Sequence, residues 1–512
     1  MDSCDVLIVG GGINGAGIAR DAAGRGLSVL LCEQADLAGA TSSASSKLIH
    51  GGLRYLEQRE FRLVREALAE REVLLRSAPH IIRPLRFVLP HDAAIRPRWV
   101  VRLGLFLYDH IGGRRSLPGT EAIRFATHPY GAPLRPEIAH GFVYSDCWVD
   151  DARLVVLNAR AAAARGAAVR TRTRLIAARR EGASWITRLR DLHSGVEQEL
   201  RAHALVNAAG PWVTDVIARA ASASAQRGMR LIKGSHIVVP RLYDGDQAYI
   251  LQNDDRRIVF VIPFQERYSL VGTTDVPFAG DPADVAIAPD ETAYLCAAVS
   301  RWFATAVTPD QVVWRYSGVR PLYDDHAETA SSVTRDYVLD LDAPDGRAPL
   351  LSVFGGKITT FRRLAEHALD KLTPFFSAAG PAWTRTAILP GGDLPDGDAT
   401  RFATGLAQSY PFLPAGLARR LAGSYGTEAH AILGDAARLE DLGVAFGGGL
   451  TAREVDFLVD CEWAREPDDI LWRRTKLGLA IDDAGVERLR CYLAARTAAP
   501  RRDGLLIARA ER

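Results

Sequence analysis

Residues 5 to 33 decide the fold of the first part of the chain, and they read D-V-L-I-V-G-G-G-I-N-G-A-G-I-A-R-D-A-A-G-R-G-L-S-V-L-L-C-E. Residues 6–9 are apolar and mostly β-branched without alternation, which is typical of a buried strand. A glycine cluster at 10–17 follows, then a segment with helical spacing, and then a second apolar run that ends at Glu33. The stretch therefore predicts a strand, a glycine turn, a helix and a second strand that ends in an acid.

The glycine spacing in this stretch is that of a dinucleotide-binding βαβ unit. Gly10 permits the tight turn, Gly12 lets backbone N–H groups approach a pyrophosphate, and Gly15 lets the helix pack near the strand. The helix N-terminus adds partial positive charge for the phosphates. Glu33, 18 residues after Gly15, can accept hydrogen bonds from a ribose, and its carboxylate would repel a 2′-phosphate. The cofactor contacts that we predict in this unit are Gly10, Gly12, Ile13, Asn14, Gly15 and Glu33.

The residues that follow this unit indicate which dinucleotide binds. Residues 38–46 read A-G-A-T-S-S-A-S-S, a run of small and hydroxyl side chains. Such a run suits a cradle of backbone groups and hydroxyls for an extended cofactor that lies beside it. A chain that binds NAD would usually continue with further alternating strands and helices. The sequence therefore favours FAD.

Composition sets limits on the class of protein. At 512 residues the chain is too long for one hydrophobic core, so two or three domains are expected. The 63 basic and 61 acidic residues leave a formal charge of +2, which does not suggest a nucleic-acid partner. The six cysteines are scattered without a C-x-x-C pair, so we expect no metal site and a reduced, cytoplasmic chain. No signal peptide is visible, and no stretch approaches the ~20 apolar residues that span a bilayer.

Longer blocks of the sequence resemble the aerobic, FAD-dependent glycerol-3-phosphate dehydrogenases of bacteria. The blocks are T-S-S-A-S-S-K-L-I-H-G-G-L-R-Y-L (41–56), Y-S-D-C-W-V-D-D-A-R-L (144–154), V-N-A-A-G-P-W (206–212), R-L-I-K-G-S-H-I-V-V-P (230–240), V-G-T-T-D-V (271–276), Y-S-G-V-R-P-L (316–322), T-R-D-Y (334–337), L-S-V-F-G-G-K-I-T-T-F-R-R-L-A-E-H-A-L (351–369) and D-D-I-L-W-R-R-T-K-L-G (468–478). The resemblance covers nearly the whole chain.

The resemblance implies both an activity and a fold. The activity is oxidation of sn-glycerol 3-phosphate to dihydroxyacetone phosphate, with electrons passed through FAD to a membrane quinone, either ubiquinone or menaquinone. Proteins of this family associate peripherally with the cytoplasmic face of the inner membrane, commonly as homodimers. The implied fold class is α/β, with an FAD-binding Rossmann-like domain of the glutathione-reductase type, an α+β substrate domain with an antiparallel sheet, and a helical C-terminal domain.

Local patterns suggest where these three parts begin and end. Short β-rich runs separated by turn residues fill residues 230–276, which is typical of an antiparallel sheet. Residues 390–398, P-G-G-D-L-P-D-G-D, mark a linker, and beyond it we expect helices without strands. The predicted parts are 1–75, 145–215 and 330–375 for the FAD domain, 76–144 and 216–329 for the substrate domain, and 390–512 for the helical domain.

The implied substrate carries a phosphate, so its site needs several cations and neutral donors. Arg54 follows a glycine pair, and Arg320 lies in G-V-R-P. Lys357 follows a second glycine pair. At such positions the backbone must lie close to something else. The predicted substrate contacts are Arg54, Tyr55, Thr273 (or Thr274), Arg320, Arg335 and Lys357, and the predicted catalytic residues are His50, Arg54, Arg320 and Lys357.

Hydride transfer leaves a hydroxyl proton to be removed, and His50 is the predicted base because histidine titrates near working pH. Two alternatives are that His50 only orients flavin or phosphate, and that His236 in K-G-S-H is the base. Gly51 and Gly52 would let the isoalloxazine ring lie against the backbone. Lys47 is expected either to neutralise flavin or phosphate charge or to be solvated.

The remaining predicted cofactor contacts come from three of the blocks above. Residues 206–212 read as a strand that ends at a small-residue turn, which in related flavoproteins closes over the adenosine side of FAD. Residues 351–369 read as a strand, a glycine pair and a helix whose N-terminus points at a ligand. These contacts are Thr41, Ser42, Ser43, Ser45, Lys47, Leu48, His50, Gly51, Gly52, Ala209, Gly210, Gly355, Gly356, Lys357 and Thr359.

Two helical segments lie outside the predicted site. Residues 61–77 have apolar positions at helical spacing between charged ones, which indicates a surface helix. Residues 95–117 combine an apolar, tryptophan-bearing run with arginines at both ends, as an interface-lying membrane anchor does. An ordinary buried helix explains the same apolar positions.

Three other functions fit parts of the pattern. A glycerol-3-phosphate oxidase would share the site and pass its electrons to oxygen. An amine or amino-acid oxidase would need one arginine for a carboxylate, whereas three arginines and a lysine suit a phosphate. A flavin-binding, non-enzymatic relative would have lost parts of the site, whereas every candidate group is present in this sequence.

Overall fold

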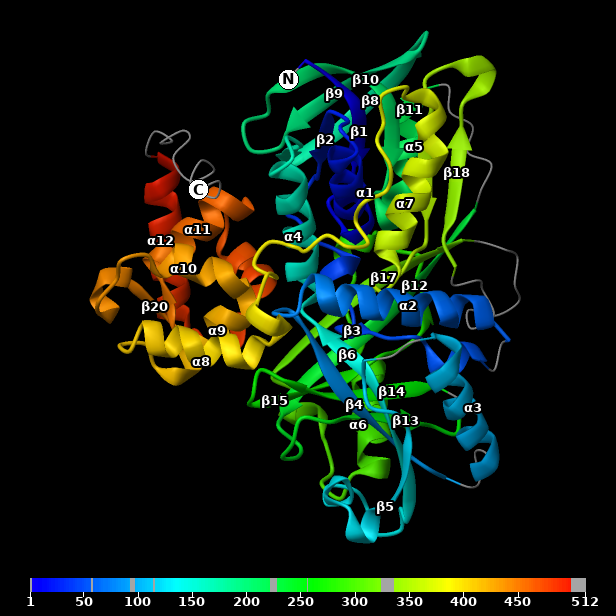
Figure 1. Ribbon diagram of the computed structural model, residues 1–512, viewed down its shortest axis with the longest axis vertical. Coiled ribbons are helices and arrows are strands. Elements are labelled where there is room, and N and C mark those ends of the chain that lie inside the picture. The colour runs from blue at the N-terminus through cyan, green and yellow to red at the C-terminus, as the bar shows by residue number, and fades with distance from the viewer. Residues whose placement is uncertain are drawn as a thin grey trace.

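The computed structural model describes residues 2–56, 59–92, 97–113, 116–221, 228–255, 257–323 and 336–498, with Arg54 described only through its backbone. Three bodies are visible in Figure 1: a helix-flanked sheet that carries the N-terminus, a second sheet below it, and a helical body beside both. The chain passes between the two sheets several times, so neither of them is built from one continuous segment.

The first sheet has nine strands and is built around β1. Its strands are β1 (Ser3–Val9), β2 (Val29–Cys32), β7 (Ala168–Arg170), β8 (Thr173–Glu181), β9 (Ser184–Asp191), β10 (Glu197–Asn207), β11 (Ala220–Ala221), β18 (Val338–Asp342) and β19 (Leu350–Phe354). The main order is β11-β8-β9-β10-β1-β2-β7, with β19 on β10 and β18 on β19. Because β1 runs parallel to β2 and β10, the carboxyl ends of all three strands meet at one edge. Dinucleotides bind at such an edge in doubly wound folds.

Helix α1 (Ile13–Gly24) starts at this edge, directly after β1. It lies between α4 (Asp151–Ala163) and α7 (Phe361–Leu372) and is buried over most of its surface. A helix enclosed in this way needs small side chains, and four of the seven residues that follow Asn14 in α1 are alanine or glycine. The N-terminus of α1 is therefore held rigidly against the sheet.

The second sheet has ten strands and faces the carboxyl edge of the first. Its strands are β3 (Leu48–Ile49), β4 (Ile82–Pro90), β5 (Glu121–Arg124), β6 (His140–Val149), β12 (Met229–Pro240), β13 (Ala248–Gln252), β14 (Ile258–Phe264), β15 (Tyr268–Gly272), β16 (Val276–Pro277) and β17 (Trp314–Tyr323). All neighbouring pairs are antiparallel except β4 and β13. The antiparallel sheet predicted for 230–276 is confirmed.

Three helices cover the two faces of this second sheet. Helix α6 (Pro289–Trp302) packs on one face, and α2 (Phe61–Ser77) and α3 (Arg98–Ile111) pack on the other. The helix predicted at 61–77 is confirmed by α2. Strand β3 belongs to this sheet, so the segment from 41 to 52 crosses from one sheet to the other.

The C-terminal body has a hydrophobic core of its own. Its helices are α8 (Ala399–Ser409), α9 (Ala415–Tyr425), α10 (Ala429–Leu433), α11 (Ala452–Glu462), the π-helix η13 (Asp469–Arg474) and α12 (Asp483–Ala498). The expectation of no strands here is wrong in one detail, because β20 (Ala445–Gly447) and β21 (Leu450–Thr451) form a small hairpin. Three consecutive glycines with positive φ make its tight turn possible.

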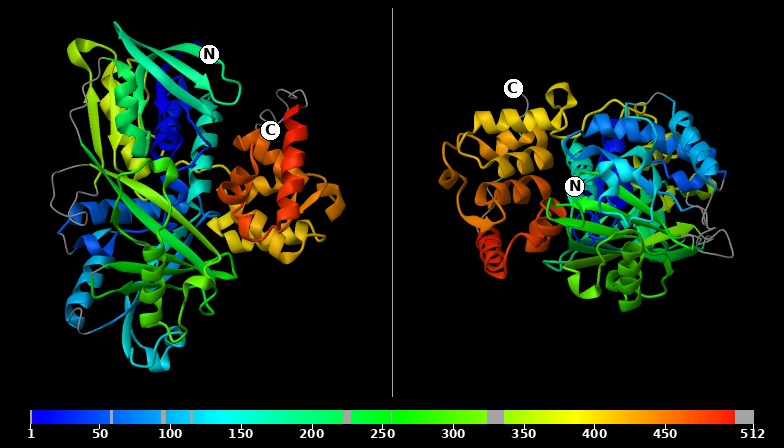
Figure 2. Two further views of the ribbon diagram at one scale, coloured as in Figure 1. Left: turned by 180° about the vertical axis from the view of Figure 1, so that it is seen from behind. Right: turned by 90° about the horizontal axis from the view of Figure 1, so that it is seen from below.

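Figure 2 shows the same arrangement from behind and from below, with the helical body at one side of the two sheets. The predicted fold class, an α/β domain with a second antiparallel sheet and a helical C-terminal part, is confirmed. The domain boundaries given above remain predictions.

Candidate active site

The glycine turn after β1 is enclosed by backbone. A Cβ added to Gly15 would lie 1.9 Å from the carbonyl oxygen of Gly10, and a Cβ on Gly10 would lie 2.4 Å from the carbonyl oxygen of Ala208. Gly10 also has a φ of +112°, which other residues rarely adopt. At Gly12, by contrast, Ser42 Oγ at 3.1 Å is the only described atom within 4 Å of such a Cβ. The turn is therefore closed where it meets the sheet and leaves room at Gly12.

Glu33 is tied to this turn by its carboxylate. It accepts hydrogen bonds from the N–H groups of Gly11 at 2.6 Å and Ala35 at 2.7 Å. Burial raises the pKa of the Glu33 carboxyl, and these two N–H groups act against that rise. Each carboxylate oxygen has a further lone pair, so the side chain can still accept a hydrogen bond from a ribose hydroxyl.

A second glycine turn, after β19, meets the start of α1. Asn14 donates from Nδ2 to the carbonyl oxygen of Gly355 at 3.1 Å. A Cβ on Gly356 would lie 2.8 Å from the same Nδ2, and both glycines have positive φ. Close by in sequence, the Thr359 hydroxyl accepts a hydrogen bond from the backbone N–H of His50 at 3.3 Å. The three predicted glycine segments, at 10–15, 51–52 and 355–356, are thus linked to one another.

The hydroxyl run after the first unit binds its neighbours through its side chains. Ser42 Oγ accepts a hydrogen bond from the N–H of Ile13 at 3.0 Å. Thr41 donates to the carbonyl oxygen of Val319, on β17, at 2.6 Å. Ser43 forms part of a short 3-10 turn in this run, and its carbonyl oxygen accepts a hydrogen bond from Lys47 at 3.0 Å. The run therefore connects the start of α1 to the second sheet.

Lys47 differs from one of our two expectations. It is fully buried, so a solvated lysine is wrong, and its Nζ lies 2.9 Å from the carboxylate of Asp151. Asp151 also accepts a hydrogen bond from Ser45 at 2.7 Å. Asp151 therefore balances the charge of Lys47, and a contact of Lys47 with flavin or phosphate remains a prediction. Leu48, next along the chain, is buried in the core of the second sheet.

The glycines at 51 and 52 make room for side chains. A Cβ on Gly51 would lie 2.6 Å from Leu68, and a Cβ on Gly52 would lie 2.2 Å from the ring of Tyr55. The Gly51 N–H donates to the Tyr108 hydroxyl at 2.7 Å, and that hydroxyl donates to Asp146 at 2.7 Å. The space on the side where a Cβ would project is taken by these side chains, and the placement of the isoalloxazine ring against the backbone of Gly51 and Gly52 remains a prediction.

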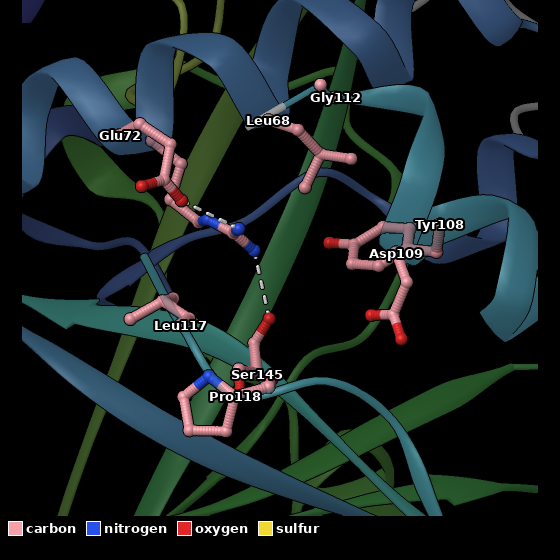
Figure 3. A pocket seen from close by; sticks show the side chains of 10 residues that line it. Leu68, Glu72, Tyr108, Asp109, Gly112, Leu117, Pro118 and Ser145 are labelled. Atoms are coloured by element: carbon pink, nitrogen blue, oxygen red, sulfur yellow. Dashed lines mark hydrogen bonds and ion pairs between the residues drawn. The ribbon is translucent and has the colours of Figure 1, made fainter. Parts of the chain in front are cut away.

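Figure 3 shows the region behind Gly51, where Leu68, Tyr108 and Ser145 border a small cavity. Its volume is about 10 Å³, about enough for one water molecule. It is too small for a substrate or a cofactor. Its walls instead hold the glycine loop in place.

His50 stands in front of this loop, next to two of the predicted substrate contacts. Its ring meets Phe260 edge-on, with 6.4 Å between the ring centroids. Burial lowers the pKa of His50, Asp146 raises it and Lys357 lowers it, so Lys357 is near enough to act on this imidazole. Lys357 Nζ lies 3.9 Å from the centroid of the Tyr55 ring. His50, Tyr55 and Lys357 thus form one group.

Arg320 lies where β17 approaches the second glycine turn. Its Nη2 donates to Thr273 Oγ1 at 3.0 Å, and its guanidinium also pairs with Asp275. A Cβ on Gly355 would lie 3.7 Å from the carbonyl oxygen of Pro321, so Arg320 and Lys357 belong to segments in contact. Arginine has five N–H donors, so Arg320 keeps some for a phosphate.

The structure distinguishes between the two threonines that we considered. Thr274 is buried, donates to Glu291 at 2.7 Å and accepts from the N–H of Ser235 at 2.9 Å. Thr273 is the one beside Arg320. Two other predicted cations, Arg335 and the side chain of Arg54, lie outside the described residues, so their positions remain predictions.

His236 lies on the same sheet face as Phe260, because His236 pairs with Gly272 and Gly272 pairs with Phe260 across adjacent strands. Strands are spaced about 4.8 Å apart, which puts His236 and Phe260 roughly 10 Å from each other. His236 is buried, stacks on Tyr316 at 4.8 Å and shares a hydrogen bond with Ser46 at 2.8 Å. Burial lowers its pKa well below the usual value. His50 is less enclosed than His236, and its role as the base remains a prediction.

Ala209 and Gly210 follow β10 at the same sheet edge as the first glycine turn. The N–H of Ala209 donates to Asn207 Oδ1 at 3.3 Å, and Gly210 has a φ of +56°. This turn lies beside Gly10, because a Cβ added to Gly10 would contact backbone atoms of Ala208 and Ala209. Ala209 and Gly210 are therefore placed to border a cofactor that lies along this edge.

A larger cavity, about 370 Å³, continues from the hydroxyl run toward the C-terminal body. Thr41, Ser43 and Lys47 line one wall, and Trp314 and Trp472 line another. The two indole rings stack at 4.4 Å. The cavity joins the cofactor edge and does not form a separate site.

Sequence reasoning missed several side chains that shape this site. Asp151 and Asp146 lie inside the block at 144–154, which offered a signal that we did not use. Tyr108 lies in the segment that we interpreted only as a membrane anchor or a buried helix. No local pattern links it to Gly51, because the two residues are 57 positions apart.

Family comparisons define the class of protein. Residues 5–362 match the model described as FAD dependent oxidoreductase, and residues 382–494 match the C-terminal domain of alpha-glycerophosphate oxidase. A crystal structure of the glycerol-3-phosphate dehydrogenase from Bacillus halodurans complexed with FAD matches with a TM-score of 0.75 and 26% identity, covering 97% of this chain and 90% of that one. The protein is an FAD-dependent oxidoreductase.

Individual relatives narrow the class. The chain is 55% identical over 479 residues to the aerobic glycerol-3-phosphate dehydrogenase of Escherichia coli K12, covering 94% of this chain and 95% of that protein. It is 56% identical over 489 residues to the glycerol-3-phosphate dehydrogenase of Pseudomonas aeruginosa PAO1, covering 96% and 94%. It is 52% identical over 483 residues to the D-erythritol 1-phosphate dehydrogenase of Brucella abortus, covering 94% and 96%. The chain belongs to the family of aerobic, FAD-dependent glycerol-3-phosphate dehydrogenases.

The residues of this chain fit FAD. The first glycine turn and the helix that it starts leave room at Gly12 for a pyrophosphate. Glu33 retains acceptor capacity at the ribose end. The 41–52 and 355–359 segments, joined by the hydrogen bond from the His50 N–H to Thr359, stand at the end where the flavin would lie.

Proposed function

We propose that this enzyme oxidises sn-glycerol 3-phosphate to dihydroxyacetone phosphate and passes the electrons through FAD to a membrane quinone. The observation that carries the proposal is the arrangement in which Lys357 lowers the pKa of His50 and follows a glycine turn that contacts the β17 segment of Arg320. It combines a base with two cations beside the predicted flavin. Relatives with more than 50% identity that are named glycerol-3-phosphate dehydrogenases support the same substrate.

In this proposal the cations and their neutral neighbours bind the substrate phosphate. Arg320 presents planar donors whose orientation Thr273 and Asp275 maintain. Lys357 adds a point charge above the Tyr55 ring. Arg54 and Arg335 are predicted to complete the set. Binding the remote phosphate fixes the hydroxyl carbon at the reacting position.

His50 is proposed to take the proton of the substrate hydroxyl. FAD, when bound, supplies the acceptor of the hydride that leaves the same carbon. Because burial and Lys357 lower the pKa of His50, its imidazole is neutral at working pH and can accept a proton. The Gly51 N–H, bonded to Tyr108, and the His50 N–H, bonded to Thr359, hold this residue in position.

A second candidate substrate is D-erythritol 1-phosphate. The observation that favours it is the relative from Brucella abortus, which matches this chain almost as well as the glycerol-3-phosphate dehydrogenases do. The two substrates share a phosphate and a secondary alcohol and differ by one carbon. The phosphate contacts described above would serve either substrate.

The electron acceptor and the location form a further part of the proposal. In α3, Trp99 is 68% exposed and Phe106 is 56% exposed, while only Leu105 and Tyr108 are buried. An ordinary buried helix is therefore wrong for this segment. Among the helices that the structure describes, none is long and apolar enough to cross a bilayer. We propose that α3 lies in the membrane interface, on the cytoplasmic face, where a quinone can reach the enzyme.

The first experiment measures flavin reduction without oxygen. Purified protein should be yellow and should bleach on adding glycerol 3-phosphate but not glycerol, with D-erythritol 1-phosphate added separately for comparison. Faster bleaching by the four-carbon phosphate would make it the substrate instead. Colourless protein, or no bleaching with either phosphate, would support the non-enzymatic alternative.

The second experiment identifies the acceptor and the membrane contact. Turnover with a ubiquinone analogue should far exceed peroxide production in air, and the reverse result would identify an oxidase. The parent should float with anionic lipid vesicles, whereas the Phe106→Glu variant should not float with them. The variant should keep its flavin and its activity in the absence of membranes. A predicted homodimer would show in sedimentation at twice the chain mass.

A further inference from the structure

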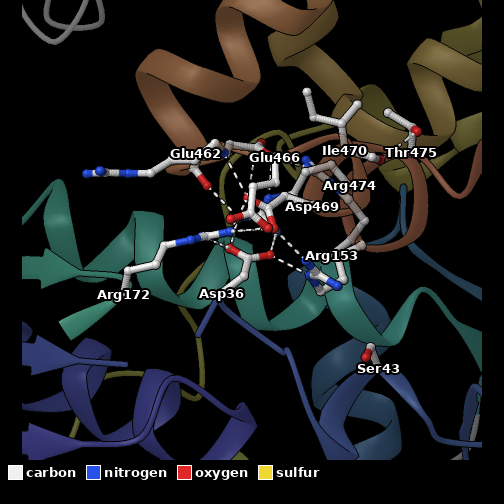
Figure 4. Close-up of polar contacts among 12 residues, drawn as sticks. Asp36, Ser43, Arg153, Arg172, Glu462, Glu466, Asp469, Ile470, Arg474 and Thr475 are labelled. Atoms are coloured by element: carbon white, nitrogen blue, oxygen red, sulfur yellow. Dashed lines mark hydrogen bonds and ion pairs between the residues drawn. The ribbon is translucent and has the colours of Figure 1, made fainter. Parts of the chain in front are cut away.

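The loop after β2 is fastened by the C-terminal body. Asp36, three residues after Glu33, is 2% exposed. Its carboxylate accepts two hydrogen bonds from Arg474, at 2.6 and 2.8 Å, and one from Arg473 at 2.5 Å. Figure 4 shows Arg474 approaching Asp36 from the C-terminal helices, across the boundary between the two bodies. This two-pronged contact joins residues 438 positions apart.

The same loop is part of the cofactor cradle. Glu33 holds the N–H of Gly11, and the N–H of Ala38 donates to the carbonyl oxygen of Gly11 at 3.0 Å. A Cβ on Gly11 would lie 3.0 Å from Leu37 Cδ2. Any movement of the loop therefore moves the first glycine turn and the acid at the ribose end together.

A second acid, Asp469, extends the contact. It begins the π-helix and is fully buried. It accepts hydrogen bonds from Arg172 at 2.7 and 2.8 Å, and the Arg172 guanidinium also lies 3.6 Å from Asp36. The backbone N–H of Arg172 donates to the carbonyl oxygen of Ala35 at 2.9 Å. The cations and acids are thus shared between the loop and the C-terminal body, and both sides need the contact to satisfy buried charge.

The other end of the same segment reaches the flavin side of the cradle. Lys476 donates to Asp150 at 2.7 Å and lies 3.4 Å from Asp151. Asp151 in turn holds Lys47 and Ser45, which belong to the hydroxyl run at the predicted flavin end. One stretch of eight residues, 469–476, therefore touches the supports of both ends of the cofactor site.

We propose that residues 469–476 of the C-terminal domain are positioning residues of the FAD site, and that docking of this domain and binding of FAD strengthen each other. The cause is that undocking would separate Asp36 from Arg473 and Arg474 and leave only Arg172 beside it, which loosens the loop that follows Glu33. Reciprocity follows, because whatever docking adds to FAD affinity FAD must add to docking. This inference rests on the predicted placement of FAD along the first glycine turn.

The test uses the full-length protein and three variants. Asp36→Asn keeps the shape of the side chain and removes its charge, and Arg474→Lys keeps the charge and removes the two-pronged geometry. Glu428→Gln is the control, because Glu428 pairs with Arg160 across the same domain boundary without touching the loop. The dissociation constant of FAD is measured by titrating each apoprotein, and thermal unfolding of the apoproteins is measured in parallel.

Asp36→Asn should weaken FAD binding on the order of tenfold. Arg474→Lys should weaken it less, and Glu428→Gln should leave it near the parent value even if all three apoproteins lose similar thermal stability. Equal FAD affinities for Asp36→Asn and Glu428→Gln would overturn the proposal, because they would show a purely structural contact.

Hydrogen exchange in the parent tests reciprocity without any variant. FAD should slow the exchange of backbone amides in 469–476, and the effect should shrink in Asp36→Asn. If FAD binds the parent tightly but leaves exchange in this segment unchanged, the coupling is absent while the proposed function stands. If the parent does not bind FAD at all, the proposed function fails first.

Discussion

The two glycine clusters of the N-terminal region look alike in sequence but are required for different reasons. At Gly10 and Gly15 the missing side chains let backbone meet backbone, with a carbonyl oxygen where each Cβ would stand. At Gly51 and Gly52 the same space is filled by the side chains of Leu68 and Tyr55. Backbone can yield only if a strand or a helix moves, whereas a side chain can rotate or be replaced.

This difference separates local from tertiary causes. At Gly15 the first cluster satisfies a rule of the βαβ unit itself, because the obstructing carbonyl is that of Gly10, whereas at Gly10 the obstructing carbonyl is that of Ala208, after β10. Gly51 is glycine because Leu68 of α2 and Tyr108 of α3 pack behind it, whereas Gly52 has a φ of +75° and makes room for the ring of nearby Tyr55. A substitution at Gly15 should therefore abolish FAD binding or folding. The effect of a substitution at Gly51 should be partly reversed by a second substitution nearby.

The largest effect is expected from Gly15→Ala. Its Cβ would overlap the carbonyl oxygen of Gly10, so α1 would have to leave β1, and the variant should purify without flavin or fail to fold. Gly12→Ala is the matched control, because its Cβ meets only the Ser42 hydroxyl, at 3.1 Å, among described atoms. That control should fold normally and bind FAD more weakly. The visible absorbance of flavin per mole of protein measures the FAD content of both variants. A folded, yellow Gly15→Ala protein would contradict the expected difference between the two clusters.

His50→Ala should have the next largest effect, at the residue that the second cluster positions. Loss of a general base typically slows a step about 10²- to 10⁴-fold. Anaerobic flavin reduction followed by stopped flow should slow by this amount, with substrate affinity and FAD content near those of the parent. Reduction at the parent rate would leave His50 with an orienting role only.

Gly51→Ala should cost less and be correctable. Its Cβ would crowd Leu68 and the Tyr108 hydroxyl, and overpacking of this kind typically costs about 1–3 kcal/mol. Thermal unfolding should show the loss, and flavin reduction should slow as His50 shifts. In the double variant with Leu68→Ala, part of the stability and rate should return. Failure of the second change to restore anything would mean that the Tyr108 hydroxyl, and not Leu68, is the contact that requires glycine at this position.

The smallest effect concerns the pH dependence of flavin reduction. Burial lowers the pKa of His50 below its usual value of 6.5, Asp146 raises it and Lys357 lowers it. The base works when neutral, so reduction at saturating substrate should be constant above that value and fall only at lower pH. Lys357→Met removes one lowering influence, and its inflection should move to higher pH by less than about one unit. An unmoved inflection would mean that His50 is not the titrating group.

The sequence by itself determined the elements whose causes are local. The strand, glycine turn, helix and strand at 5–33 and the helix at 61–77 follow from spacing along a continuous stretch, and both are present. The role of Gly10 in the tight turn and that of Gly15 in helix packing could be predicted from the same local spacing. Adjacent residues in a regular element have positions fixed by its period, so pattern alone suffices.

Only the tertiary structure decided which distant groups meet. Lys47 is balanced by Asp151, 104 positions away, and Asp36 by Arg474, 438 positions away. Strand β3 joins the second sheet, although its neighbours in sequence serve the first. Partners of this kind depend on how whole layers stack and which charges become buried together, and the spacing of residues along the chain does not carry that information.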